Sequence, residues 1–386
     1  MNKVSKLQVL YEGRNVGTLA LYQKHLAAFQ YSDEWIAEGF SISPFSLPLD
    51  KEVHIPQILP FDGLFGVFAD SLPGGWGRLL VDRLLRRHGI NPLQITSIER
   101  LAIVGGSGMG ALQYVPKLEL GEENKLSNLD EIAAECSMIL STDKGNVACE
   151  EDCSENLDGL FSLGGSSGGA RPKILTEIDG QDWIIKFPAL EDSPEIGLQE
   201  FEYAECARAC GIEMAETRLF ASKKCSGYFG TKRFDRILVE EGNVRRVHVV
   251  SAAGLLETSQ QDLALDYDVL MKACLKLTDD FAEVERLYRL MCFNVFAHNR
   301  DDHAKNFGFL YDEAESRWKF APAYDLTYSN SLFGEHATSV HGNGKDPGKD
   351  DLLAVAAQIG MEKTRAAAVA DDVRDCVNEH LSKYLK

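Results

Sequence analysis

The seven residues RDDHAKN at positions 300–306, followed by YDL at 324–326, decide the fold of this 386-residue chain. Within them Asp301 stands five residues before Asn306, and a second acid, Asp325, comes further along the chain. A carboxylate can accept a proton from a reacting hydroxyl, and Asn and Asp oxygens are hard ligands suited to Mg²⁺. The pattern therefore predicts a site for metal-assisted phosphoryl transfer.

Protein kinases place their catalytic groups in the same order. Their R-D-x-x-x-x-N element supplies a base and a metal ligand, and their D-F-G element supplies a second metal ligand. Here the first element is matched at Asp301 and Asn306, whereas the second reads YDL around Asp325. This mismatch indicates a relative with the same chemistry rather than an ordinary eukaryotic-type kinase. We expect Asp301 to be the base, Asn306 and Asp325 to bind Mg²⁺, and His303 to lie on the phosphate side of the loop.

A lysine ends an apolar strand further upstream. Lys186 follows the run WII at 183–185, and a buried lysine is costly unless an anion meets it. An ATP phosphate is the natural anion for such a lysine in a kinase. Glu202, on the helix expected over 196–210, is the predicted partner of Lys186, and Glu200 and Glu205 are rival candidates.

Two glycine-rich runs differ in their expected roles. The run GGSSGGARPK at 164–173 has neither the G-K-[ST] ending of a Walker A loop nor the G-x-G-x-x-G spacing of a kinase loop. Its backbone N–H groups still suit phosphate binding. The run GGSGMG at 105–110 precedes residues 112–115, which read as a strand, so we interpret it as a structural turn.

The composition excludes some classes of protein. The chain carries 40 basic against 59 acidic residues, a net charge of −19, so it gains little from displacing the counterions of nucleic acid or anionic membrane. It has no apolar stretch long enough to span a membrane and no apolar signal core after Met1, so we expect a cytoplasmic protein. The nine cysteines form no C-x-x-C pair, although Cys149/Cys153 and Cys206/Cys210 are spaced four apart. We interpret them as small buried thiols rather than a Zn²⁺ site.

The fold class predicted for the chain is α+β, with an N-terminal mixed β/α accessory domain followed by a two-lobed, protein-kinase-like fold. The accessory domain and its linker are expected over 1–150 and the kinase domain over 151–386, with a sheet-rich small lobe at about 151–240 and a helical lobe at about 241–386. Alternating apolar residues predict strands at 7–11, 16–21, 27–31, 173–178, 183–187, 217–221 and 227–234. Helical periodicity predicts helices within 66–90 and at 196–210, 269–277, 281–297, 352–359 and 364–385.

Several motifs together resemble the HipA family of serine/threonine kinases, which contains the toxins of two-component toxin–antitoxin systems. They are SSGGARPK at 166–173, IIKFP at 184–188, RFDR at 233–236, DDHAKNF at 301–307 and PAYD at 322–325. The HAKNF block is the most specific match. The runs DSLPG at 70–74 and GAL at 110–112 resemble the accessory domain of the same family.

This resemblance implies a site with Asp301 as the catalytic base and with Asn306 and Asp325 as Mg²⁺ ligands. The residues implied to contact ATP are Gly168, Gly169, Ala170, Arg171, Pro172, Lys173, Lys186, Lys232, Arg233, Phe234, His303, Ala304, Lys305, Asn306, Tyr324 and Asp325. Among them, the loop 168–173 is expected to cover the phosphates and residues 232–234 to supply the hinge to adenine. Family members autophosphorylate a serine at the start of the glycine-rich loop. Ser166 matches that position, and Ser162 and Ser167 are alternatives because this chain has additional Gly and Ser residues there.

The resemblance also implies transfer of the ATP γ-phosphoryl group to a Ser or Thr of a protein, with a translation component such as an aminoacyl-tRNA synthetase as the suspected substrate. A small helix-turn-helix antitoxin is the expected partner, and contact with DNA is expected only through it. Two alternatives stay open, a small-molecule kinase that uses the same machinery and an inactive pseudokinase that acts as a binding module. The intact set of Lys186, Asp301, Asn306 and Asp325 argues against the pseudokinase.

Overall fold

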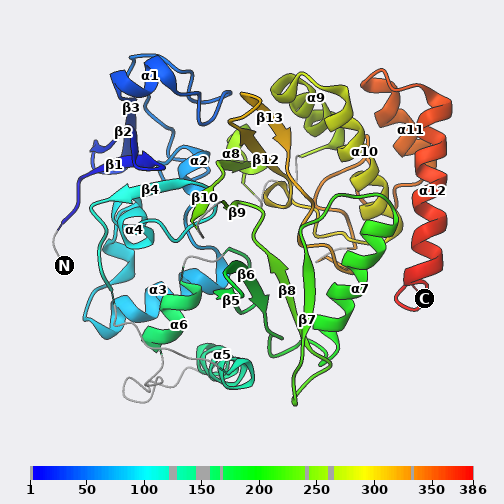
Figure 1. The fold of residues 1–386 in the computed structure, drawn as a ribbon, viewed down its shortest axis with the longest axis horizontal. Coiled ribbons are helices and arrows are strands. Elements are labelled where there is room, and N and C mark those ends of the chain that lie inside the picture. The colour runs from blue at the N-terminus through cyan, green and yellow to red at the C-terminus, as the bar shows by residue number, and fades with distance from the viewer. Residues whose placement is uncertain are drawn as a thin grey trace. The chain divides into compact units, whose positions relative to one another are not determined.

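The structure is a computed structural model that describes residues 3–120, 128–144, 157–165, 168–239, 243–259, 265–331 and 334–385. The chain divides into two compact units, one formed by Met1–Leu198 with Arg218–His248 and the other by Gln199–Thr217 with Val249–Lys386. Figure 1 labels the helices and strands of both units. The domain boundary expected near residue 150 falls within 145–156, outside the described residues, and stays a prediction.

The first unit begins with a four-stranded antiparallel sheet in the order β3-β2-β1-β4. Its strands are β1 (Lys6–Tyr11), β2 (Arg14–Tyr22), β3 (Leu26–Tyr31) and β4 (Leu112–Val115). The predicted hairpin of β1 and β2 is confirmed, and Gly13 makes its turn with a φ of 76°, a conformation that glycine adopts without strain. The helices of this part are α1 (Asp33–Glu38), α2 (Gly66–Ala69), α3 (Gly75–Arg87), the 3₁₀ turn η1 (Pro92–Gln94) and α4 (Ser97–Val104).

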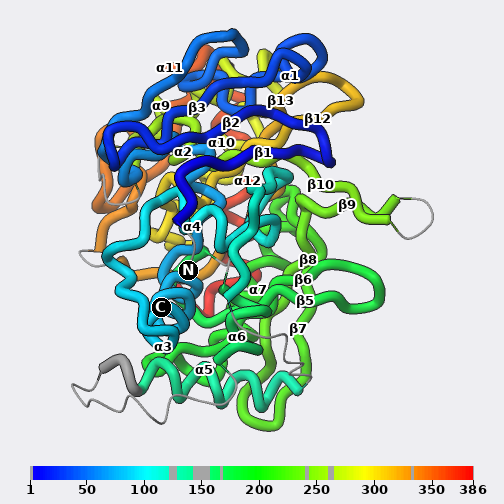
Figure 2. The backbone as a smooth tube through the Cα atoms, turned by 90° about the vertical axis from the view of Figure 1, so that its left-hand side faces the viewer, coloured from blue at the N-terminus to red at the C-terminus, as the bar shows by residue number. Residues whose placement is uncertain are grey.

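A second sheet has the strand order β5-β6-β8-β7. It contains β5 (Lys173–Ile178), β6 (Gln181–Lys186), β7 (Thr217–Phe220) and β8 (Tyr228–Lys232), close to the predicted bounds. Helices α5 (Leu129–Lys144) and α6 (Leu157–Gly164) lie near α3 in both views (Figures 1 and 2). The ribbon of β9 (Arg236–Leu238) and β10 (Val244–Arg246) completes this unit.

One hydrophobic cluster explains why α3 and the second sheet belong to the same unit. Leu80, Leu84 and Leu85, the apolar stripe predicted for this helix, are buried in the cluster together with Ile174 of β5 and Trp183 of β6. Burial of apolar surface is the main stabilising contribution to such a core. The helix that follows the DSLPG run is therefore packed into the core of the small lobe.

The second unit is mainly helical. Its elements include most of α7 (Ile196–Ala209) together with α8 (Ala252–Leu256), α9 (Tyr267–Thr278), α10 (Phe281–Phe296), α11 (Lys349–Gln358) and α12 (Lys363–Leu381). α10 is the central helix of this unit, because several neighbouring elements pack against it. Its buried residues include Leu287, Met291 and Phe293. The helices predicted for this region are confirmed.

A small antiparallel sheet in the second unit differs from the sequence prediction, which treated the region beyond about 250 as helical. Its strands are β11 (Val249–Ser251), β12 (Gly308–Asp312) and β13 (Arg317–Phe320). Phe309 pairs with Phe320 in the ladder, and both side chains are buried. Strands this short offer few alternating positions, so their sequence pattern is weak. The α+β class is nevertheless confirmed, and no helix among the described residues is long and apolar enough to cross a membrane.

Candidate functional site

The loop after α10 separates two adjacent aspartates that look equivalent in the sequence. Asp302 is buried, and its Oδ2 accepts hydrogen bonds from the Tyr267 hydroxyl at 2.9 Å and from His336 Nδ1 at 3.0 Å. The backbone N–H of Thr338 donates to the other oxygen at 3.2 Å. Asp301, by contrast, has an exposed side chain. Asp302 therefore anchors the loop, and Asp301 is the carboxylate that it presents to solvent.

The anchor continues into the core of the second unit. Asn294 of α10 donates from Nδ2 to the Tyr267 hydroxyl at 3.0 Å, and Asn299 donates to Asn294 Oδ1 at 2.9 Å. Buried polar groups that satisfy one another in this way hold a loop rigidly. The sequence prediction missed the roles of Asp302, Tyr267 and His336, because their contacts join distant parts of the chain.

The 3₁₀ turn η3 (Ala304–Asn306) sets the orientation of the predicted metal ligand Asn306. Asn306 Nδ2 donates to the backbone carbonyl of Asp301 at 2.6 Å. The amide oxygen Oδ1 of Asn306 is therefore the atom able to bind a cation. The Tyr324 hydroxyl donates to the Lys305 carbonyl at 2.7 Å and so connects the second motif to the first.

Asp325, the other predicted ligand, is half-buried and has a left-handed φ of 60°. An amide oxygen and a carboxylate are the hard donors that Mg²⁺ requires, so the residues present fit this ion. His303 Nε2 lies 3.9 Å from Asp301 Oδ1, at the outer limit of an ion pair.

In the first unit, two lysines occupy directly opposed positions of the β5–β6 ladder. Lys173 pairs with Lys186, and both side chains are buried. Residues directly opposite in an antiparallel pair lie on the same face of the sheet, where like charges repel each other. The ammonium of Lys186 lies 5.5 Å from the centre of the Phe229 ring. Two cationic side chains therefore lie on one face of this sheet, on neighbouring strands.

The glycine-rich loop lies next to these lysines. Gly169 has a φ of 77°, and a Cβ placed there would lie only 2.7 Å from Lys173 Nζ. The Gly169 carbonyl accepts a hydrogen bond from the backbone N–H of Trp76 at 3.0 Å, so the loop contacts the start of α3. Arg171 pairs with Asp192 at 2.9 Å. Glycine adopts this left-handed conformation without strain.

The serines predicted to be autophosphorylated differ in what the structure describes. Ser166 and Ser167 lie outside the described residues. Ser162 is exposed on α6, and its hydroxyl donates to the Asp158 carbonyl at 3.0 Å.

The segment expected to contact adenine has a structural role at its central residue. The guanidinium of Arg233 donates to Asp235 Oδ1 at 2.9 Å and to the Gly108 carbonyl at 2.9 Å, and the Arg233 N–H donates to the Asp182 carbonyl. Burial by itself raises the pKa of Asp235, but the charges of Arg233 and Arg236 outweigh burial, so this pKa is lowered. The side chain and the N–H of Arg233 thus already have protein partners. The hinge role of 232–234 stays a prediction.

The buried ion cluster of Arg233, Asp235 and Arg236 accounts for the glycine run at 105–110. Gly110, the last residue of the run, donates its N–H to Asp235 Oδ2 at 2.7 Å, and β4 follows directly. The prediction of a structural turn is confirmed.

Three acids of α7 were candidate partners of Lys186, and the preferred one, Glu202, has other partners. The Glu202 carboxylate pairs with Lys383 at 2.6 Å and accepts from the Tyr384 hydroxyl at 2.5 Å. Glu205 is exposed and pairs with Arg208. Glu200 is the buried member of the three, with 2% of its surface exposed.

Comparison with known proteins identifies the family. The model of the HipA N-terminal domain matches residues 7–115, and that of the HipA-like C-terminal domain matches residues 165–381. The serine/threonine-protein kinase toxin HipA of Shewanella oneidensis is 24% identical over 327 residues, which cover 78% of this chain and 69% of the relative. The protein Y4mE of Sinorhizobium fredii, named as an unconfirmed kinase, is 26% identical over 352 residues, which cover 84% of this chain and 77% of the relative.

A solved structure extends the likeness to the whole fold. The complex of the Shewanella oneidensis MR-1 toxin–antitoxin system, with HipA, HipB and operator DNA, contains a chain that superposes with a TM-score of 0.72 at 19% identity. The superposition covers 98% of this chain and 90% of that one, which confirms an accessory domain followed by a kinase-like fold. With both domain models matched in order along the sequence, this chain belongs to the HipA family.

Proposed function

We propose that this chain is a serine/threonine protein kinase of the HipA type, which transfers the γ-phosphoryl group of Mg·ATP to a protein hydroxyl. The observation that supports it most is the loop 301–306, where the buried Asp302 holds an exposed Asp301 while the Asn306 amide is fixed on the Asp301 carbonyl. The proposed base and one proposed metal ligand thus belong to the same anchored loop. Phosphoryl transfer depends mainly on such positioning and on charge neutralisation.

The residues have separate roles in this proposal. Asp301 accepts the proton of the incoming hydroxyl, and Asn306 and Asp325 hold Mg²⁺. The bound ion neutralises charge on the phosphates. Lys173 and Lys186 supply positive charge to the phosphates, and the backbone of the loop 168–173 covers them.

The partners belong to the same proposal. The Shewanella structure contains HipB and operator DNA, and on this likeness we infer a small helix-turn-helix antitoxin as the partner of this chain. A net charge of −19 opposes direct binding to DNA, so contact with DNA would come through the antitoxin. A translation component, such as an aminoacyl-tRNA synthetase, is the proposed substrate.

The experiment that tests the function is phosphoproteomics after induced expression, comparing the wild type with Asp301→Asn. Glu34→Gln, a neutralised exposed acid on α1, is the matched control. We expect new protein phosphosites with the wild type and the control, and none with Asp301→Asn. Phosphosites unchanged in Asp301→Asn would contradict the proposal, and labelling of a small molecule in place of proteins would support the alternative of a small-molecule kinase.

A further inference from the structure

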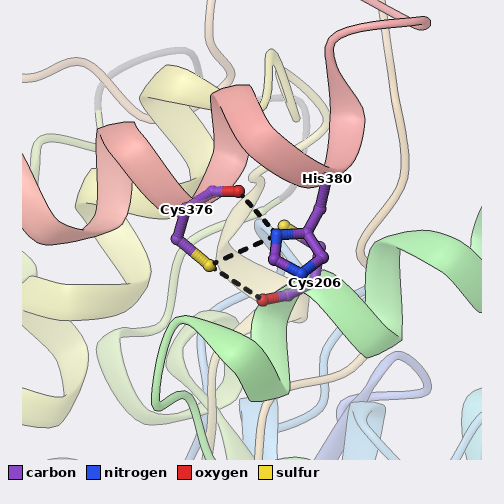
Figure 3. A group of neighbouring side chains, drawn as sticks. All are labelled: Cys206, Cys376 and His380. Carbon is purple, nitrogen blue, oxygen red and sulfur yellow. Dashed lines mark hydrogen bonds between the residues drawn. The ribbon is translucent and has the colours of Figure 1, made fainter.

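Sulfur and imidazole ligands from two distant helices converge in the second unit. Cys206 lies on α7, and Cys376 and His380 lie on α12 (Figure 3). One potential ligand atom from each of these residues lies within 4.8 Å of the other two. Cys210, just after α7, brings its Sγ to 4.0 Å from Cys206 Sγ.

The spacing in the sequence matches the geometry of two helical pairs. Cys206 and Cys210 are four residues apart, as are Cys376 and His380, and residues at i and i+4 lie on the same face of a helix. Each pair thus reads as a C-x-x-x-C or C-x-x-x-H half-site, within the ligand spacings common for Zn²⁺. The prediction of small buried thiols considered only the cysteine pairs, and the α12 partners become visible only in the structure.

The separations suit a metal better than a disulfide. Zn–S bonds of about 2.3 Å and Zn–N bonds of about 2.0 Å place tetrahedral ligand atoms roughly 3.5–3.8 Å apart. Cys376 Sγ lies 3.8 Å from His380 Nδ1, and the Sγ atoms of Cys206 and Cys210 are 4.0 Å apart. A disulfide needs sulfurs at about 2.05 Å. The ligand atoms of Cys206, Cys376 and His380 therefore lie close enough to share one ion, and Cys210 is the fourth candidate ligand through its contact with Cys206.

The partial exposure of the cluster indicates that its side chains are more than apolar core residues. Cys206 and Cys210 are buried, whereas Cys376 is half-buried and His380 is exposed, so the cluster extends from the core to the surface. This arrangement gives an ion a path of entry.

We propose that Cys206, Cys210, Cys376 and His380 form a closed structural Zn²⁺ site that fastens α12 to α7. On binding, the three thiols release three protons, and the three thiolates and one neutral imidazole bind the ion. His380 Nδ1 also lies 2.9 Å from the Cys376 carbonyl, so binding through Nδ1 requires the tautomer with the proton on Nε2. The site would hold the C-terminal helix against the helix that carries Glu200.

The first measurement is the metal content of the full-length chain, purified from zinc-supplemented cells and analysed by mass spectrometry. The variants Cys376→Ser and His380→Gln each remove one ligand, and Cys225→Ser, a half-buried cysteine outside the cluster, is the matched control. We expect about one Zn²⁺ per chain in the wild type and the control. Titration against a chromophoric chelator should show affinity at least about 10-fold weaker in both ligand variants. Because His380 is exposed, the His380→Gln chain is expected to fold, and its circular dichroism spectrum checks this.

Substitution with Co²⁺ identifies the ligands directly. The wild type should show thiolate-to-metal charge-transfer bands and the intense bands of tetrahedral Co²⁺, and Cys376→Ser should lose part of the charge-transfer intensity. Absence of Zn²⁺ and of these bands in the wild type would overturn the proposal, and so would a metal content in both ligand variants equal to that of the wild type. So would a disulfide between these cysteines, found by alkylation and mass spectrometry without reductant.

Discussion

At the residue scale, the adjacent acids Asp301 and Asp302 show how burial assigns different roles to one residue type. The Asp302 carboxylate is buried and accepts three hydrogen bonds, whereas the Asp301 side chain is exposed. A carboxylate held by several donors has little freedom to act on a substrate. We therefore expect Asp301 to take part in the chemistry and Asp302 to fix the geometry of the loop.

Asp301→Ala should lower the transfer rate by about a hundred- to ten-thousand-fold, the usual contribution of a general base. Nucleotide affinity should stay unchanged, because a base acts only in the chemical step. Asp302→Ala should instead lower the melting temperature by several degrees, because buried donors lose their acceptor at about 1–3 kcal/mol each. Calorimetric titration with Mg·ATP and thermal melting separate the two effects. If Asp301→Ala abolished both binding and transfer, Asp301 would be a structural or metal-binding residue.

Asp325 is a second test at this scale. Asp325→Ala removes one of the two proposed protein ligands of Mg²⁺, so metal-dependent ATP binding should be lost. The measurement is calorimetric titration of the variant with ATP in the presence and absence of Mg²⁺. An unchanged affinity for Mg·ATP would show that the metal assignment is wrong.

At the scale of elements, α7 carries acids whose surroundings differ. Glu202 already pairs with Lys383, whereas Glu200 is buried, and a buried carboxylate requires a positive partner. We therefore expect Glu200, rather than the Glu202 preferred from the sequence, to be the acid that activates Lys186. Glu200→Gln should weaken ATP binding and transfer at least about 10-fold, a loss of about 1.4 kcal/mol.

Glu202→Gln is the matched control for this experiment. It removes only a partly exposed ion pair, a contribution of about 1 kcal/mol or less to stability. Kinase assays and calorimetric titration of both variants give the answer. Equal losses in the two variants would reject the assignment of Glu200.

The glycine-rich loop is the second element with a testable role. A phosphate on Ser166 adds roughly −1.5 to −2 charges to a loop that covers an anionic triphosphate. Repulsion should displace the loop, break the hydrogen bond from the Trp76 N–H to the Gly169 carbonyl and lower ATP affinity. Arg171, in the same loop, already pairs with Asp192.

Incubation of the purified protein with ATP, followed by mapping of phosphosites, tests this switch. Activity should fall as a phosphate accumulates on Ser162, Ser166 or Ser167. A kinase that stays fully active with this loop unmodified would contradict the switch, and Asp301→Asn serves as the control for self-modification.

At the scale of the whole molecule, stability should depend on pH through one buried histidine. His248 packs against the rings of Tyr11 and Phe40, and its Nε2 lies 2.8 Å from the Ile42 carbonyl. Burial lowers the pKa of His248 from 6.5 to about 4. The neutral form is therefore favoured in the folded state, and this contribution to stability is present above pH 6.5 and lost as the pH falls towards 4.

The size of the effect follows from linkage. A pKa difference of this size corresponds to at most about 3 kcal/mol of unfolding free energy. Melting temperatures measured between pH 7.5 and pH 4.5 should fall more steeply for the wild type than for His248→Gln. Parallel pH profiles would show that His248 does not govern the acid sensitivity.

Much of the architecture and of the reaction class could be predicted from local sequence. Alternation and helical periodicity predict elements such as β5, α7 and α10, because these patterns depend on neighbouring residues. The runs at 300–306 and 324–326 indicate the chemistry, because the candidate base Asp301 and the candidate metal ligand Asn306 stand in one short run. The short strands β12 and β13 were missed, since four or five residues provide little periodicity.

Only the tertiary structure decided the surroundings of residues that look alike in the sequence. Burial separates Asp302 from Asp301, and Glu200 from Glu202. The β5–β6 register brings Lys173 opposite Lys186. The packing of α12 brings Cys376 and His380 to Cys206. Each of these outcomes depends on contacts between residues distant in sequence, and such contacts are determined by how the elements pack rather than by any local pattern.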